Sequence, residues 1–238
     1  MIIRKQANNK RLHAARSYLR ASESGFTIIE SLVAILVVSI LLVAIAPVLS
    51  LSVATRIQSR RIELATQAAK SYIDAVKTKK IAAPTSTGTN ALTAYAAPTA
   101  TGTLTCTTAN SYCTAPTGTS LYCVDFDSSG GCENTSVTDM IVQGFRYNLA
   151  SSTANNGYAL GVRVYRADAF KETTTLLKNT STTKTTQATF TGGAGQRKAP
   201  LVEMTTDIND TVPKYSDLCA RIKGPDPTNN AQDVGCTN

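Results

Sequence analysis

The fold is decided by the stretch GFTIIESLVAILVVSILLVAIAPVLSLSVATRIQSRRIELATQAAKSYIDAVKTKK, residues 25–80. From Ser31 to Thr55 it holds 25 consecutive residues without a charge, rich in Val, Ile and Leu. As a helix this run would extend about 37 Å, which is enough to cross a bilayer. We therefore expect residues 26–55 to form a transmembrane helix.

The helical pattern continues through residues 56–80, where one stripe is apolar and the opposite face is polar and charged. This pattern is typical of a helix that packs on a domain along one side. The stripe consists of Ile57, Leu64, Ala65, Ala68, Tyr72 and Val76. One helix is thus expected from Phe26 to Lys80, with a kink at Pro47, whose ring removes an amide donor.

An ordinary cleaved signal peptide is the alternative interpretation of the apolar run, with AIA at 44–46 as the cleavage site. Three observations oppose it: the leader before the run is long, Pro47 would directly follow the cut, and the helical pattern continues beyond it. We therefore expect the apolar segment to remain in the mature protein.

Residues 81–238 are expected to form a separate head. Residues 81–120 are rich in Thr, Ser, Ala, Pro and Gly, which predicts irregular loop with short strands. Alternation predicts strands over 139–149 and 157–167, joined as an antiparallel hairpin by a turn containing NNG, and a third strand over 199–208. The apolar faces are Ile141, Phe145 and Tyr147 on the first strand, and Tyr158, Leu160, Val162 and Val164 on the second. The expected fold class is α+β, a long N-terminal helix packed on a small antiparallel sheet.

Charge and histidine content exclude several functions. Six basic residues and one acid precede residue 26, so residues 26–238 carry only +3 of the net +8. No nucleic-acid motif accompanies this charge, and no nucleic-acid partner is expected. The only histidine is His13, so a chain starting near residue 26 has no histidine-based catalysis or metal site. With no other catalytic constellation, the protein is not expected to be an enzyme.

Six cysteines lie beyond the apolar segment, which favours disulfides in an oxidising compartment. They are Cys106, Cys113, Cys123, Cys132, Cys219 and Cys236. A thiolate metal site is the rival interpretation, but the gaps lack the close C-x2-C pairs that zinc usually uses. Cys106 with Cys113 and Cys123 with Cys132 are candidate pairs among the 15 pairings that six cysteines allow.

An acidic loop, CVDFDSSGGCENTS at residues 123–136, is a candidate calcium site. Asp125, Asp127, Ser129 and Glu133 surround two glycines with a spacing that partly matches an oxygen-ligand calcium loop. Ser136 stands where the terminal bidentate glutamate should be. A glycine turn closed by a disulfide accounts for the same residues more simply, so no cofactor is expected and calcium stays the alternative.

The N-terminal region resembles the type IV prepilins and pseudopilins. A basic leader, residues 1–25, precedes Gly25, Phe26, Thr27 and Glu30, and an apolar helix with a proline at Pro47 follows. The resemblance implies that a prepilin peptidase cleaves between Gly25 and Phe26 and N-methylates Phe26. It also implies that Glu30 meets the new α-amine of a neighbouring subunit during assembly.

The chemistry of Glu30 agrees with that role. A carboxylate in a membrane helix costs up to about 2.5–3.5 kcal/mol and usually has a partner. Cleavage creates an α-amine with a reference pKa of about 7.7–8 at Phe26, four residues away and on the same helix face. The alternative is that Glu30 only favours the helix N-terminus through the macrodipole, by about 0.3–1 kcal/mol.

The resemblance further implies partners, location and function. It implies that Cys219 and Cys236 close a C-terminal loop at the exposed face of the head. The expected protein is a minor subunit of a pilus-like or type II secretion-like fibre, first in the cytoplasmic membrane with its head in the periplasm. Its partners would be the peptidase, other pilin subunits and the inner-membrane assembly platform. The N-terminal stretch is also similar to pseudopilins of polysaccharide secretion in filamentous cyanobacteria. The alternative function is a membrane-tethered module that binds a ligand or calcium.

Overall fold

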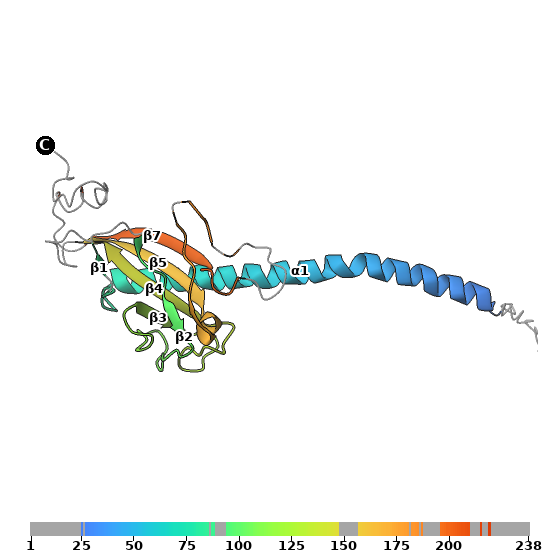
Figure 1. Ribbon diagram of the computed structural model, residues 1–238, viewed down its shortest axis with the longest axis horizontal. Coiled ribbons are helices and arrows are strands. Elements are labelled where there is room, and N and C mark those ends of the chain that lie inside the picture. The colour runs from blue at the N-terminus through green and yellow to red at the C-terminus, as the bar shows by residue number, and fades with distance from the viewer. Residues whose placement is uncertain are drawn as a thin grey trace, which may run out of the picture. The chain divides into compact units, whose positions relative to one another are not determined.

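The computed structural model describes residues 25, 27–85, 87–88, 94–147, 157–180, 182–185, 187, 196–209, 215 and 219. The chain divides into two compact units, Met1–Pro47 and Val48–Asn238. The elements are α1 (Ile28–Lys77), β1 (Thr87–Gly88), β2 (Thr99–Thr101), β3 (Ser120–Val124), β4 (Met140–Tyr147), β5 (Tyr158–Arg166), the 3-10 helix η3 (Ala167–Lys171), β6 (Thr173–Thr175) and β7 (Val202–Ile208) (Figure 1).

The helix α1 ends through a backbone motif that the sequence did not reveal. Lys79 adopts a positive φ of 57°. Its N–H donates to the carbonyl of Val76 at 3.0 Å, and the N–H of Lys80 donates to the carbonyl of Ala75 at 2.9 Å. These are the two bonds of a Schellman motif, here with lysine in the position that glycine usually takes. The helix therefore stops at Lys77, three residues before the predicted end, and it continues through Pro47.

The main sheet is built around the predicted hairpin. β4 and β5 pair antiparallel from Met140↔Arg166 to Tyr147↔Ala159. β7 pairs antiparallel with β5, and β3 pairs antiparallel with the first part of β4. The short β1 adds a parallel pairing at the other end of β4. The hairpin, the third strand and the α+β class are confirmed.

The second half of α1 packs on one face of this sheet (Figure 1). Leu64, Ala65, Ala68, Tyr72 and Val76 of the predicted stripe are buried there. The strand residues of this core cluster are Tyr122, Val124, Met140, Val142, Tyr158, Leu160, Val162, Val164 and Ile208. Ile57 is the exception in the stripe, since it is 48% exposed. Its neighbour Gln58 is buried instead and donates to Gln187 Oε1 at 3.1 Å.

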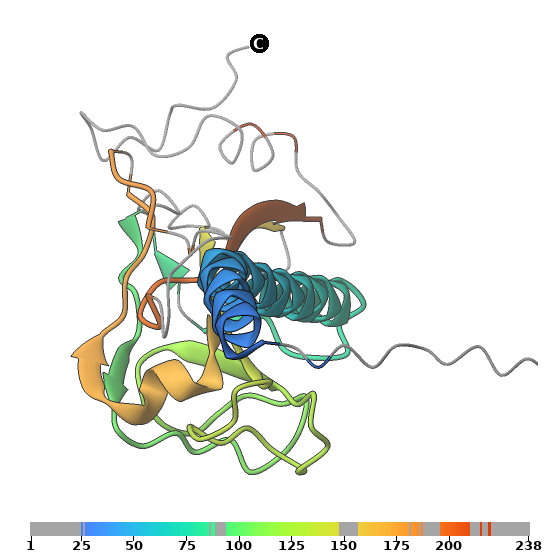
Figure 2. The same cartoon turned by 90° about the vertical axis from the view of Figure 1, so that its right-hand side faces the viewer.

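The opposite face of the sheet carries a second core cluster that the sequence did not predict. The Thr- and Ala-rich segment was expected to form irregular loop with short strands, yet its Ala97 and Ala100 are buried in this cluster with Tyr165 and Phe170. β2 and β6 form a separate two-stranded sheet, with η3 beside it (Figure 2). Small alanine side chains let this segment approach closely, so a composition poor in large apolar residues still covers the sheet.

The two predicted apolar stripes lie on opposite faces of the sheet, and a separate layer covers each face. Val142 faces Val164 on the α1 side of the hairpin. Phe145 lies on the other side, where the ring of Tyr95 stacks on it at a centroid distance of 5.0 Å. Alternation predicted each stripe correctly, but it could not say that each stripe has its own covering layer.

Candidate functional site

The N-terminus of α1 is capped by Thr27. Its hydroxyl accepts a hydrogen bond from the backbone N–H of Glu30 at 3.3 Å, and its carbonyl accepts from the N–H of Ser31 at 3.1 Å. The order Thr-x-x-Glu is that of a capping box. Such a cap typically stabilises a helix by about 1 kcal/mol. Thr27 therefore fixes where the helix begins, immediately after the predicted processing junction.

The carboxylate of Glu30 is exposed in the first turn of α1. There it lies at the positive end of the helix dipole. Among the described residues no side chain forms an ion pair with it. Phe26, the residue whose amine is its predicted partner, lies outside the described residues. The ion pair between them stays a prediction.

Gly25 is exposed, and a Cβ added to it would meet no atom within 4 Å. Packing against the described residues therefore does not require glycine at this position.

The first half of α1 presents an unbroken apolar surface. Each described residue from 27 to 53 is exposed. Within the described residues, α1 is the one helix long and apolar enough to cross a membrane, and its most apolar stretch is not buried. An apolar surface of this size needs lipid or other helices around it.

Two serines of this half bond their hydroxyl groups back to the helix. Ser31 donates to the carbonyl of Ile28 at 2.8 Å, and Ser39 donates to that of Ile35 at 2.7 Å. Bonds of this kind satisfy a polar group inside the helix when water is absent. The segment is thus suited to an apolar environment despite these serines.

The acidic loop brings together a different set of residues from the one predicted. Asp125 and Asp127 each offer one carboxylate oxygen to a group of three, and the third member is Asp139. Glu133 is not a member of this group, and it accepts a hydrogen bond from the hydroxyl of Thr135. The Ser129 hydroxyl donates to the carbonyl of Gly131, while the Ser129 N–H donates to Asp127. Binding of calcium by the four residues chosen from the sequence stays a prediction.

Local hydrogen bonds hold the first two carboxylates. Asp125 accepts from the backbone N–H groups of Asp127, Ser128 and Gly130 at 2.6–3.0 Å. Hydrogen bonds from Ser129 and Ser136 lower the pKa of Asp127 below its ordinary value.

Asp139 is the buried member of the group. Its side chain is fully buried, and its Oδ1 accepts from the N–H of Phe126 at 3.2 Å. Its Oδ2 has no hydrogen-bond partner in the described part of the chain. Burial raises the pKa of Asp139, and the carboxylates of Asp127 and Asp125 raise it further. In the sequence, Asp139 is marked only by its position as a single acid at the start of an apolar strand.

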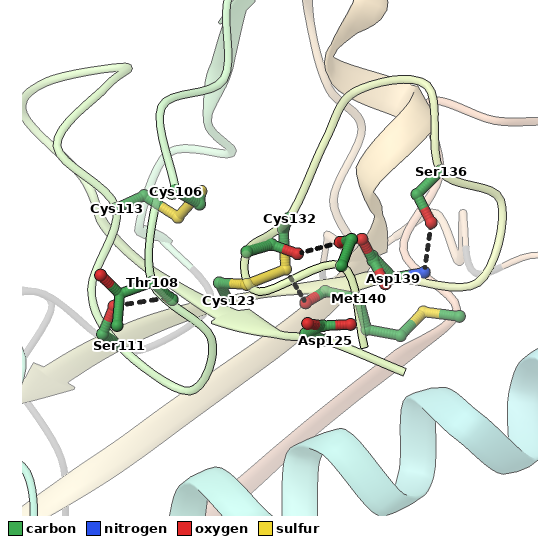
Figure 3. Close-up of a disulfide and its surroundings, with 12 residues drawn as sticks. Cys106, Thr108, Ser111, Cys113, Cys123, Asp125, Cys132, Ser136, Asp139 and Met140 are labelled. Carbon is green, nitrogen blue, oxygen red and sulfur yellow. Dashed lines mark hydrogen bonds between the residues drawn. A yellow bond between two sulfur atoms is a disulfide. The ribbon is translucent and has the colours of Figure 1, made fainter. Parts of the chain in front are cut away.

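Two disulfides join pairs of described cysteines in the loops of the head. They join Cys106 to Cys113 and Cys123 to Cys132, and the second closes the acidic loop beside Asp125 and Asp139 (Figure 3). The N–H of Asp139 donates to the Ser136 hydroxyl oxygen at 3.2 Å in the same region. Cys219 is buried and also disulfide-bonded. Cys236, its predicted partner, lies outside the described residues.

Removing the Cys123–Cys132 bridge is expected to lower the free energy of unfolding of the head by about 2–3 kcal/mol in the chain-entropy model. Both sulfurs lie in the second core cluster, so the change tests that core as well. The double variant Cys123→Ala/Cys132→Ala would be compared with wild type by denaturant unfolding. Cys106→Ala/Cys113→Ala is the matched control, because its loop is similar in length but Cys113 is only partly buried. A larger loss in the control would contradict this assignment.

Comparison with known proteins finds one family. Residues 20–46 match the family model described as the prokaryotic N-terminal methylation motif. No curated protein and no solved structure matches the chain significantly. The match contains Gly25, Thr27 and Glu30 and most of the apolar run. It supports a prepilin-type signal, a pilin-like protein and membrane anchoring by α1.

Proposed function

We propose that this protein is a structural subunit, a minor pilin or pseudopilin, of a type IV pilus-like or type II secretion-like fibre. One observation carries the proposal: the methylation motif, the Gly25–Phe26 junction, the capped start of α1 and the exposed apolar run coincide in register. A capped helix or an apolar run also occurs by itself in proteins of many kinds. Together these features match a helix that is first anchored in a membrane and then packed among other helices.

In this proposal, prepilin peptidase cleaves between Gly25 and Phe26 and methylates Phe26. Residues 1–25 carry six basic residues, which favours a cytoplasmic leader. A single pass then places the head in the periplasm, where disulfides form readily. From there the subunit would enter a fibre, with the cell surface as a further location.

Assembly would use the apolar half of α1. It would leave the lipid and bury its exposed Val, Ile and Leu side chains against the helices of other subunits. The inner-membrane assembly platform would carry out this transfer. The head, built on the second half of α1, would carry any specificity. The resemblance to pseudopilins of polysaccharide secretion leads us to favour secretion over motility or adhesion.

N-terminal mass spectrometry of the mature protein tests the proposal. We expect a chain that begins at N-methylated Phe26. Gly25→Val should retain the leader, because in this proposal the peptidase recognises the glycine, while the described residues leave room for a side chain there. Thr27→Ser is the matched control, since it keeps the hydroxyl that caps α1, and it should be processed normally. A different N-terminus in wild type, or complete cleavage of Gly25→Val, would refute the processing step.

The second candidate is a membrane-tethered module that uses the same signal. The group formed by Asp125, Asp127 and Asp139 favours it, because these carboxylates could serve as a ligand set in the head. The two functions separate by fractionation: a fibre subunit appears in sheared fibres, whereas a tethered module stays with the membrane.

A further inference from the structure

Three acidic side chains meet where the acidic loop returns to the main sheet. Asp125 and Asp127 lie in the loop closed by the Cys123–Cys132 bridge, and Asp139 directly precedes β4. One carboxylate oxygen from each lies within 4.8 Å of the other two. In the described part of the chain no lysine or arginine forms an ion pair with any of them. The group therefore gathers negative charge that the described residues do not neutralise.

A second observation concerns the buried carboxylate oxygen of this group. Asp139 is 0% exposed, and its Oδ2 has no hydrogen-bond partner among the described residues. A buried carboxylate oxygen without a donor is costly, and neighbouring carboxylates add to that cost. The two loop carboxylates beside it supply further oxygens, not donors. A positive ion bound by all three would satisfy the buried oxygen and the charge together.

We propose that Asp125, Asp127 and Asp139 form a divalent-cation site in the head, and that calcium is the ion that fits it. Calcium binds six to eight oxygens at about 2.3–2.6 Å in irregular geometry, so oxygens on opposite sides of it lie about 4.8 Å apart. Magnesium requires a near-octahedral shell and retains several waters. Three carboxylates from a loop and a strand start suit the first ion better.

The site would join two parts of the head. Asp125 and Asp127 belong to the disulfide loop, whereas Asp139 precedes a central strand whose neighbours are β3 and β5. Bound calcium would hold the loop against this strand. The head is therefore expected to be more stable with calcium, by mass action on the folded state.

The test uses the full chain in detergent after treatment with EDTA, with calcium chloride itself as the probe. We expect one calcium per chain by equilibrium dialysis, with a dissociation constant of about 10⁻⁴–10⁻³ M, as in extracellular modules. Calcium at tenfold that constant should raise the Tm by about 3–6 °C, and magnesium at the same concentration should give a clearly smaller shift. The absence of saturable calcium binding up to about 10 mM, tenfold the upper constant, would overturn the site. An equal shift with magnesium would overturn the assignment to calcium.

Two variants decide which acids bind. Asp139→Asn keeps an oxygen that can accept from Phe126 but removes the buried charge. It should abolish the calcium shift and should be at least as stable as wild type without calcium. Glu133→Gln is the matched control, a nearby loop acid outside the group, and it should bind calcium as wild type does. Unchanged affinity in Asp139→Asn, or lost binding in Glu133→Gln, would refute the assigned ligands.

Discussion

Replacing Tyr72 by alanine is expected to lower the free energy of unfolding of the head by about 3–5 kcal/mol, the usual cost of truncating a buried aromatic residue. Tyr72 is fully buried between α1 and the sheet. Its ring contacts those of Tyr112 and Tyr122 at centroid distances of 6.3 and 5.2 Å. Its hydroxyl shares a 3.0 Å hydrogen bond with that of Tyr112. Truncation would thus remove both packing and a polar contact.

Tyr72 also lies against Gly144, so the effect of Gly144→Ala on the free energy of unfolding should depend on whether Tyr72 is present. A Cβ on this residue would lie 2.0 Å from the Tyr72 hydroxyl and 2.7 Å from the ring carbon that bears it. Gly144→Ala should therefore destabilise wild type, by about 1–3 kcal/mol for overpacking. In the Tyr72→Ala background the clash is gone and a methyl group fills part of the cavity. There, Gly144→Ala should be neutral or stabilising.

The four proteins form a double-mutant cycle that denaturant unfolding, followed by near-ultraviolet circular dichroism, can measure. Tyr72→Phe is the control. It keeps the ring and loses the hydrogen bond, so it should cost only about 1 kcal/mol. Additive effects of Gly144→Ala and Tyr72→Ala would contradict the close approach of α1 to β4 on which this core depends.

The fold was predictable where a pattern was long and periodic. The uncharged run and the stripe from Leu64 to Val76 predicted α1, and alternation predicted β4 and β5. Local patterns did not predict the second core cluster, because Ala97 and Ala100 are too small to mark a core in a sequence. Their burial depends on a close approach to the sheet, which is a tertiary property.

The two candidate sites also differ in how far the sequence alone could predict them. The processing junction and Glu30 lie within a few residues of one another, so the sequence alone displays their spacing. Asp139 was missed because it lies beyond the acidic loop and meets Asp125 and Asp127 only when the chain turns back into β4. The contiguous loop pattern instead selected Ser129 and Glu133, which lie close to Asp125 and Asp127 in the sequence.

Replacing Glu30 by glutamine is expected to reduce incorporation into fibres by at least tenfold while leaving processing and the stability of the head unchanged. Glutamine keeps the capping-box pattern that begins with Thr27, so the start of α1 should be preserved. What the substitution removes is the charge. In the fibre, the variant would leave the neighbouring α-amine buried without a charged partner, and breaking a buried pair costs about 3–5 kcal/mol. Each 1.4 kcal/mol corresponds to about tenfold in an equilibrium, so the predicted loss is a lower bound.

Glu63→Gln supplies the matched control for this charge effect. Glu63 is an acid on the same helix, 2.7 Å from Arg60, but both side chains are more than 60% exposed. Exposed pairs contribute about 0–1 kcal/mol, so this variant should assemble as wild type does. Quantitative immunoblotting of sheared fibres against membranes would measure both variants. Normal incorporation of Glu30→Gln would show that the charge is not needed for assembly and would limit Glu30 to favouring the N-terminus of α1. Loss of assembly with Glu30→Gln but not with Glu63→Gln would support the proposal that the α-amine created by cleavage after Gly25 is the partner of this carboxylate.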